Sequence, residues 1–310
     1  MALLAEYALT PDVFDVSSYT SEEVCGLHLQ ILNEVLLHEG LVRDLRQGEW
    51  GKLFVGADRS WHKGVKELFI QLKIQKRLVS FPPVSKAVPA TDADWCSEAL
   101  ATHQKRALAG IIVSDGLAVA HQGNAAVAAV GRLASTPWWT GRSPSLRLPR
   151  TLRSYQAALD LVLLHAKSMM FIDPYLDPSD RHQYGDFMTL LNLAGGRTPV
   201  PVIEIHRAAW YGSGQDKRPK IAEVVAALTP GLSDCTRRTG LKFDVFLWHD
   251  VHDRYLISDL IGVSLPYGFA TTKAPKAVTT WTRIGRVDRD SVQREYDVAV
   301  NRPVHQFTVK

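Results

Sequence analysis

The sequence lacks the features that anchor a chain in a membrane or cross-link it covalently. Its three cysteines, Cys25, Cys96 and Cys235, are odd in number and widely separated, which gives neither a disulfide framework nor the spacing of a zinc site. No apolar run approaches the roughly 20 residues that a membrane-spanning helix requires. The first residues are apolar, but no basic region accompanies them. We therefore expect no signal peptide, no membrane association and a reducing, cytoplasmic location.

A strong charge of either sign is also missing. The 310 residues carry a formal net charge of +4 at pH 7, which is compatible with a polyanionic ligand but does not require one. Apolar residues make up 46% of the chain and charged residues 22%, the balance of an ordinary folded protein, and the length suffices for two domains. Carboxylates and histidines at metal-ligand spacing are absent as well, so we expect neither a bound metal nor a cofactor.

Helical patterns dominate residues 1–135. A capping box predicts the start of a helix over 21–38, and apolar residues at helical spacing predict a second helix over 61–78 and a third from Asp92. The lysines along the second helix are more typical of a solvated surface than of a nucleic-acid contact. A short strand is expected over 109–113. The pattern predicts a mainly helical domain that recognises a protein partner or nucleic acid.

Residues 136–150 are rich in proline, glycine, serine and arginine, a composition typical of a boundary between domains. The two tryptophans of this stretch suit stacking on bases, and its three arginines, Arg142, Arg147 and Arg150, suit clamping phosphates. A linker held against a neighbouring surface explains these residues better. We therefore interpret this stretch as a linker, and we expect residues 151–310 to fold separately.

From residue 151 onwards strands and helices alternate, which predicts a layered α/β sheet. The expected strands, separated by helical patterns, cover 168–172, 200–205, 243–248 and 255–257. Asp173 directly follows the first of these strands, while Glu204 and His206 stand at the end of the second. Open α/β sheets place their sites at the carboxyl ends of strands, so these three residues are candidates for a site.

The most informative stretch is His252-Asp253-Arg254, followed at the right distance by Asp259 in the pattern H-x-R-x4-D. Alternation along a strand would place His252 and Arg254 side by side on one face. An imidazole can attack phosphorus, and an adjacent cation can hold the phosphate oxygens. Asp259, at the end of the apolar run, would brace the site.

This motif resembles the H-x-K-x4-D motif of the phospholipase D superfamily, with arginine in the lysine position. The resemblance covers about residues 150–310 and is closest to short, single-motif bacterial domains, in which a D-P-Y strand end, here starting at Asp173, precedes an H-D-R strand. Where the family usually has a glycine–glycine or glycine–serine pair, this chain has Pro266-Tyr267, with Ser264 and Gly268 nearby. Arginine is a better clamp than a proton donor, so phosphate binding is the safer expectation.

The resemblance implies a metal-independent phosphodiesterase, and the basic chain favours a nuclease acting on DNA or RNA. His252 would act as nucleophile or acid, Arg254 and Ser264 would bind the phosphate, and Asp259 would support them. Asp173, Glu204 or His206 would orient the imidazole. One motif per chain implies a homodimer, because the chemistry needs two histidines. Similar domain pairings are suspected of acting in bacterial defence against phage.

Two other hypotheses remain open from the sequence. In the first, the altered motif is catalytically inactive, and the module binds phosphate or nucleic acid and recruits a protein partner through the N-terminal domain. In the second, the motif is an ordinary polar strand end with one structural histidine. A site that binds phosphate but lacks a second histidine would support the inactive binding module, because the nuclease needs two histidines at one phosphate.

Overall fold

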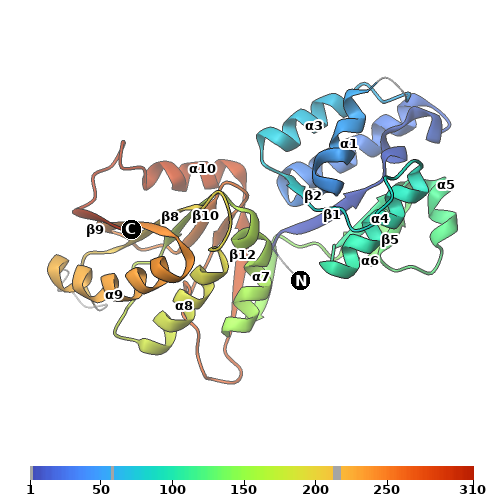
Figure 1. Cartoon of the computed structure of the whole chain (residues 1–310). Coiled ribbons are helices and arrows are strands. Elements are labelled where there is room, and N and C mark those ends of the chain that lie inside the picture. The colour runs from blue at the N-terminus through green and yellow to red at the C-terminus, as the bar shows by residue number, and fades with distance from the viewer. Residues whose placement is uncertain (1–2, 57–58, 212–217) are drawn as a thin grey trace. The chain divides into compact units, whose positions relative to one another are not determined.

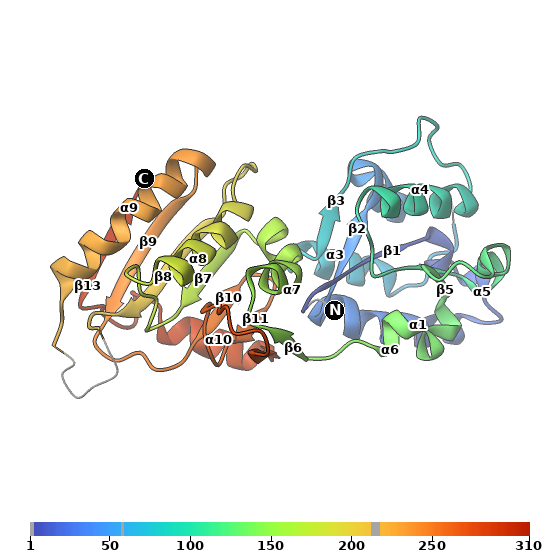
Figure 2. The same cartoon turned by 90° about the horizontal axis from the view of Figure 1, so that it is seen from below.

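The computed structural model describes residues 3–56, 59–211 and 218–310, which form two compact units (Figures 1 and 2). The N-terminal unit is Leu4–Arg142, and the C-terminal unit is Ser143–Lys310 together with the first residues up to Leu3. Both units are built on β-sheets with helices around them, so the expected α/β class is confirmed. Within the described ranges, no helix combines the length and apolar character needed to cross a bilayer.

The N-terminal unit is organised around a five-stranded parallel sheet with the order β3-β2-β1-β4-β5. Its strands are β1 (Ala5–Leu9), β2 (Gly40–Asp44), β3 (Leu78–Ser80), β4 (Gly110–Val113) and β5 (Val127–Ala129). Its helices are α1 (Glu22–His38), α2 (Glu49–Lys52), α3 (Val65–Ile74), α4 (Asp92–Lys105), α5 (Asp115–Ala118) and α6 (Pro137–Thr140). The three longest helices match the sequence patterns, and β4 confirms the strand expected over 109–113.

The prediction of a mainly helical N-terminal domain is wrong in architecture, because a parallel sheet forms its centre. The missed strands are short, and charged residues interrupt their apolar runs. Glu6 in β1 and Arg43 in β2 are both fully buried and form an ion pair of 2.8 Å across the two strands. Buried charges are tolerated when they are paired and hydrogen-bonded, so these strands lie in the core although their sequences look polar.

The stretch expected as a linker, residues 136–150, is ordered structure that belongs to both units. Its first part forms α6, whose Trp139 is buried beneath Arg142, with the guanidinium 3.8 Å from the ring centroid. Its last part forms β6 (Ser145–Pro149), which pairs with a strand of the C-terminal unit. The division between the units therefore falls within the predicted linker, between Arg142 and Ser143.

The C-terminal unit contains an eight-stranded mixed sheet with the order β13-β9-β8-β7-β10-β11-β12-β6. Besides β6, its strands are β7 (Ser168–Ile172), β8 (Val202–Ala208), β9 (Lys242–Trp248), β10 (Tyr255–Ser258), β11 (Gly262–Ser264), β12 (Val278–Ile284) and β13 (His305–Val309). Strands β7, β8 and β9 are parallel, and the other pairings are antiparallel. The four strands expected from the sequence correspond to β7, β8, β9 and β10.

Helices lie on both faces of this sheet (Figures 1 and 2). One face is covered by α7 (Leu152–His165), α8 (Arg181–Leu193) and α9 (Ile221–Thr239), and α10 (Arg286–Glu295) lies on the other. The α10 face has its own apolar cluster, which includes Met170, Phe246, Trp248 and Tyr296. The end of β7 and the beginning of β10 lie next to each other in this sheet, between the helices of its two faces (Figures 1 and 2).

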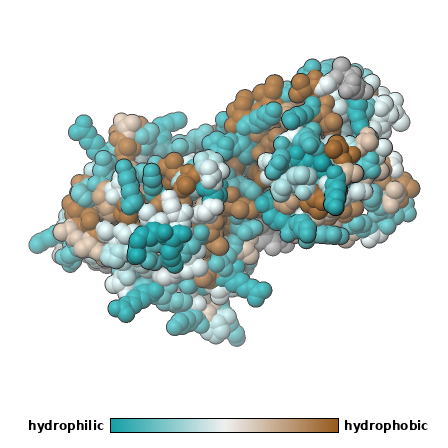
Figure 3. All heavy atoms as spheres, in the orientation of Figure 1, coloured by the Kyte–Doolittle hydropathy of each residue, from teal (hydrophilic) through white to brown (hydrophobic). Residues whose placement is uncertain are grey.

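Exposed apolar side chains gather on one part of the N-terminal unit. Leu27 and Ile31 on α1 and Ile70 and Ile74 on α3 are all exposed, and these two helices pack against each other. Figure 3 shows hydrophobic surface over these helices, interspersed with hydrophilic residues. Helix α3 corresponds to the lysine-bearing helix expected over 61–78. Its solvent-facing side carries apolar residues as well as lysines.

Candidate functional site

Asp173 is the central residue of the candidate site and lies directly after the end of β7. Its side chain is buried and accepts two backbone hydrogen bonds, from Tyr175 N to Oδ1 at 3.0 Å and from Phe269 N to Oδ2 at 3.2 Å. Burial, the dominant cause, raises the pKa of Asp173 above its ordinary value, although the two N–H donors and Arg254 act in the opposite direction. The carboxylate is thus a fixed, largely desolvated acceptor at the carboxyl end of a strand.

Arg254 faces this carboxylate from the loop before β10. Its Nε lies 3.6 Å from Asp173 Oδ1, and one terminal nitrogen donates a hydrogen bond of 2.9 Å to the carbonyl of Pro266. The guanidinium also stacks over the ring of Tyr175, with its central carbon 4.6 Å from the ring centroid. These three contacts hold the guanidinium in place while 27% of the side chain stays exposed.

Gly268 lies directly against the Asp173–Arg254 pair, at a position where only glycine fits. Its φ of +57° lies in the left-handed region that disfavours side chains, and an added Cβ would overlap the carboxylate of Asp173. Such a Cβ would also lie 3.0 Å from Cδ of Arg254. The turn therefore brings the backbone directly against the Asp173–Arg254 pair.

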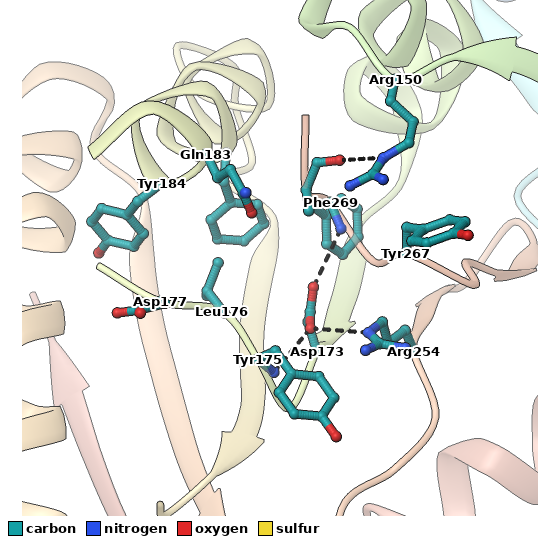
Figure 4. Close-up of a pocket in the computed structure, with 12 residues that line it drawn as sticks. Arg150, Asp173, Tyr175, Leu176, Asp177, Gln183, Tyr184, Arg254, Tyr267 and Phe269 are labelled. Atoms are coloured by element: carbon teal, nitrogen blue, oxygen red, sulfur yellow. Dashed lines mark hydrogen bonds and ion pairs between the residues drawn. The ribbon is translucent and has the colours of Figure 1, made fainter. Parts of the chain in front are cut away.

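Asp173, Tyr175 and Arg254 line a pocket with a volume of about 160 Å³ (Figure 4). Arg150, which follows β6, lines the same pocket, donates a hydrogen bond of 3.1 Å to the carbonyl of Ala270 and stacks over Tyr267 at 4.4 Å. Lining residues beyond those described so far are Leu176, Asp177, Gln183, Tyr184, Phe187 and Phe269. The pocket thus gathers two guanidinium groups from segments far apart in the sequence.

His252 does not lie in this pocket, and its predicted place on a strand beside Arg254 is wrong. It is exposed over 65% of its side chain, and its Nε2 is 3.8 Å from Asp250 Oδ1. The strand begins only at Tyr255, which pairs with Ile172, the last residue of β7. Tyr255 is thus the first residue of β10 that can pair with β7, and the residues just before it form a loop in which Val251 is buried while His252 and Asp253 are exposed.

Asp259 lies at the opposite end of β10 from Arg254, so it does not brace the site as expected. Its Oδ1 accepts hydrogen bonds from the backbone N–H groups of Lys167, at 2.9 Å, and Ser168, at 3.4 Å. Four strand residues separate it from Arg254. Asp259 therefore fixes the start of β7, a structural role.

Glu204 and His206 belong to the α10 face of the sheet and do not line the pocket. His206 is fully buried, its Nδ1 accepts a hydrogen bond of 3.1 Å from Trp248 Nε1, and its Nε2 is 3.4 Å from Glu204 Oε2. Burial lowers the pKa of His206, although Glu204 acts in the opposite direction, and Phe246 stacks on the ring at 4.8 Å. The expectation that these residues orient His252 is wrong, because they form a separate internal network.

Ser264, expected to bind phosphate, lies at the end of β11 and pairs with Tyr255, outside the pocket lining. Of the predicted site residues, the structure therefore brings only Asp173 and Arg254 together in the pocket. Sequence reasoning did not assign Arg150, Tyr175 or Tyr267 to the site. Tyr175 is part of the D-P-Y strand end, and Tyr267 is part of the Pro266-Tyr267 pair that replaces the glycine pair of the family. Both residues therefore lie in motifs of the resemblance, which implied no role for them.

The N-terminal unit has buried polar groups at the corresponding edge of its own sheet. Asp12 follows β1 and is buried, and its Oδ2 accepts a hydrogen bond of 3.3 Å from the N–H of Ser114, which follows β4. Its Oδ1 has no hydrogen-bond partner among the described residues. In the described part of the chain, no three histidine, cysteine or carboxylate residues are grouped to hold a metal ion.

Comparison with known proteins leaves the chain without an assigned family. No protein family matches the sequence. No curated protein matches it either. The solved structure of TrmBL2, an archaeal chromatin protein with a novel mode of DNA binding, aligns over 76% of this chain and 80% of its own, with 10% identity and a TM-score of 0.29. A likeness this weak says nothing about function, so the proposals below depend on the site itself.

Proposed function

We propose that the C-terminal unit is a binding module for a phosphoryl group, which it holds in the pocket between Arg150 and Arg254. The observation that carries this proposal is the convergence of two guanidinium groups from separate segments on one pocket of about 160 Å³. Guanidinium groups present several N–H donors in a plane that matches the oxygens of phosphate. A pocket of this size suits a compact anion, because sites for drug-sized ligands are usually about 300 Å³ or larger.

The charges around the pocket favour an anion. The Asp173 carboxylate already accepts two backbone N–H groups, and it faces Arg254 at 3.6 Å. Asp177, the other lining carboxylate, accepts hydrogen bonds from the N–H and hydroxyl of Ser179 at 2.9 and 2.8 Å. Among the described residues, Arg150 has no carboxylate within ion-pair distance, so one positive charge remains available to a ligand.

A third cation adds to this field from inside the unit. Arg207, near the end of β8, is 1% exposed; burial lowers its pKa, while Tyr211 and, more weakly, Asp177 and Asp173 act in the opposite direction. Its Nε has no hydrogen-bond partner among the described residues. Because charges interact more strongly away from water, the buried Arg207 partly offsets the negative charge of Asp173 and Asp177.

The proposal is tested by substituting Arg254 in the full chain and measuring the affinity for a short phosphodiester at fixed salt. Loss of a hydrogen-bonded charged group costs about 1.5–3 kcal/mol, so Arg254→Ala should bind roughly 10- to 150-fold more weakly. Arg147→Ala is the matched control, because Arg147 is exposed on β6, lies outside the pocket and carries the same charge. Equal affinities for Arg254→Ala and Arg147→Ala would refute the site.

A second candidate function is the phosphodiesterase suggested by the motif. The observation in its favour is the exposure of His252, two residues before Arg254, which leaves the imidazole accessible to a second copy of the chain. Cleavage of labelled DNA or RNA that survives EDTA and disappears in His252→Ala would establish it. Because the lining contains no histidine among the described residues, binding without cleavage is the function that the geometry supports better.

A further inference from the structure

Each arginine of the pocket is paired with an exposed tyrosine ring. Arg254 stacks on Tyr175 at 4.6 Å and Arg150 stacks on Tyr267 at 4.4 Å. Figure 4 shows the two tyrosines on opposite sides of Arg254, at the rim of the pocket. The site therefore combines a cationic centre with an aromatic surface on either side.

Both rings stay in contact with solvent although large aromatic groups usually bury most of their surface. Tyr175 is 40% exposed and Tyr267 is 53% exposed. Tyr175 is nevertheless held, because the edge of Trp210 packs against it with the ring centroids 5.9 Å apart. Tyr267 is held by Arg150 and by the turn at Gly268. Two fixed, exposed rings beside an anion site lose little conformational entropy when a flat ligand stacks on them.

The size of the pocket restricts what can stack there. A volume of about 160 Å³ admits a phosphoryl group, and any larger part of the ligand must lie outside, at the rim where the tyrosines are. A ligand that presents planar rings on both sides of a phosphate is a polynucleotide. In a duplex the bases already stack on one another, whereas in a single strand their faces are available.

We propose that the bound phosphoryl group belongs to a single-stranded nucleic acid, whose neighbouring bases stack on Tyr175 and Tyr267. This inference rests on the phosphoryl-binding function proposed above and names its ligand class. Because every base has a flat aromatic face, binding tolerates different sequences. Because the pocket holds few phosphates, the affinity depends only weakly on salt compared with that of proteins that track a long backbone.

The test compares labelled oligonucleotides that share a backbone but differ in their bases. Fluorescence anisotropy of the full chain is measured with a ten-residue oligothymidylate, with an abasic strand of equal length, and with a duplex. Tyr175→Ala and Tyr267→Ala should each weaken oligothymidylate binding about 5- to 100-fold and leave the abasic strand unaffected. Tyr175→Phe and Tyr267→Phe keep the ring and should bind like the wild type. The duplex should bind more weakly than the single strand.

Failure of this inference differs from failure of the phosphoryl site. If the wild-type chain binds the abasic strand as tightly as oligothymidylate, bases are not recognised, and a phosphorylated ligand without bases, such as a phosphopeptide, takes their place. If either alanine variant loses both strands equally, the ring supports the arginine rather than a base, and the inference is overturned. If Arg254→Ala binds the abasic strand as well as the wild type does, the phosphoryl site itself fails.

Discussion

Each unit has a buried aspartate beyond the carboxyl end of a strand with a parallel neighbour, yet the two aspartates are surrounded differently. Asp12 follows β1 and Asp173 follows β7, and both are almost completely buried. Asp173 has two backbone donors and faces Arg254, whereas Asp12 has Ser114 N and, among the described residues, no cation within ion-pair distance. The carboxyl edge of a sheet therefore supplies a place for a site, and the partner residues decide what it binds.

The difference arises from the strands next to each aspartate. In the N-terminal unit β1 lies between two parallel strands, so its carboxyl edge meets only other strand ends. In the C-terminal unit β7 pairs with the antiparallel β10, whose beginning lies beside the end of β7. This arrangement brings Arg254, one residue before β10, next to Asp173. A mixed sheet thus gives the aspartate a partner that a purely parallel sheet does not supply.

Substitution of a glycine in each unit should give the largest difference in stability between the two units. Gly268→Ala combines a left-handed backbone with a Cβ that overlaps Asp173, and it should lower the free energy of unfolding of the C-terminal unit by about 2–4 kcal/mol and abolish phosphoryl binding. Gly123→Ala in the N-terminal unit is the control. Its φ is +86° but no atom lies within 4 Å of the added Cβ, so only backbone strain of about 1 kcal/mol is expected. Urea unfolding of both variants measures the difference, and equal losses would contradict the close packing at Gly268.

Replacing each aspartate by asparagine tests the partners directly. In Asp173→Asn an N–H₂ group must face a backbone N–H donor, and Arg254 loses its carboxylate, so we expect a loss of about 1–3 kcal/mol in the free energy of unfolding. In Asp12→Asn the amide oxygen can keep the bond to Ser114 while the N–H₂ takes the unpartnered position, so the change should stay within about 0.5 kcal/mol. Thermal unfolding with equal shifts for both variants would show that the two environments do not differ.

The pH dependence of the C-terminal unit follows from the raised pKa of Asp173. Between the ordinary value of 3.8 and the higher value in the folded state, the folded chain binds the proton more readily than the unfolded chain. The contribution of Asp173 to stability is therefore present at acid pH and is lost as the pH rises through the folded pKa. Subtracting the pH profile of Asp173→Asn from that of the wild type should give a free-energy difference that falls with rising pH. A flat or rising difference would mean that Arg254 outweighs burial.

The smallest effect is expected at His252, the residue that the motif predicts to be the nucleophile or the acid. Its exposed side chain makes no close packing contact that a truncation would remove, so His252→Ala should change the free energy of unfolding by less than about 0.5 kcal/mol. Phosphoryl affinity should also match that of the wild type, because Arg254 is untouched. A melting scan and one anisotropy titration suffice. Weaker binding in the folded variant would place His252 at the ligand after all.

The sequence was sufficient for the α/β class and for two of the site residues. Asp173 and Arg254 were found because a buried apolar strand ends at one and a motif contains the other. His252 was misplaced because the start of β10 depends on where β7 ends, a tertiary fact that the spacing of the motif does not contain. The strands β1 and β2 were missed because the Glu6–Arg43 pair makes them look polar. Arg150 was only one of three arginines in residues 136–150 that could clamp a phosphate, because only folding shows which of them reaches the pocket.

The position of β6 has a consequence for how this unit forms during synthesis. β6 is the first strand of the unit to be made, but it occupies one edge of the sheet and pairs with β12, near the end of the chain. Arg150 follows β6, and the carbonyl that holds it is 120 positions further along. A nascent chain therefore cannot hold Arg150 in the pocket until Ala270 and β12 have been synthesised. The pocket thereby depends on contacts between residues that are far apart in the sequence, and such contacts form late in folding.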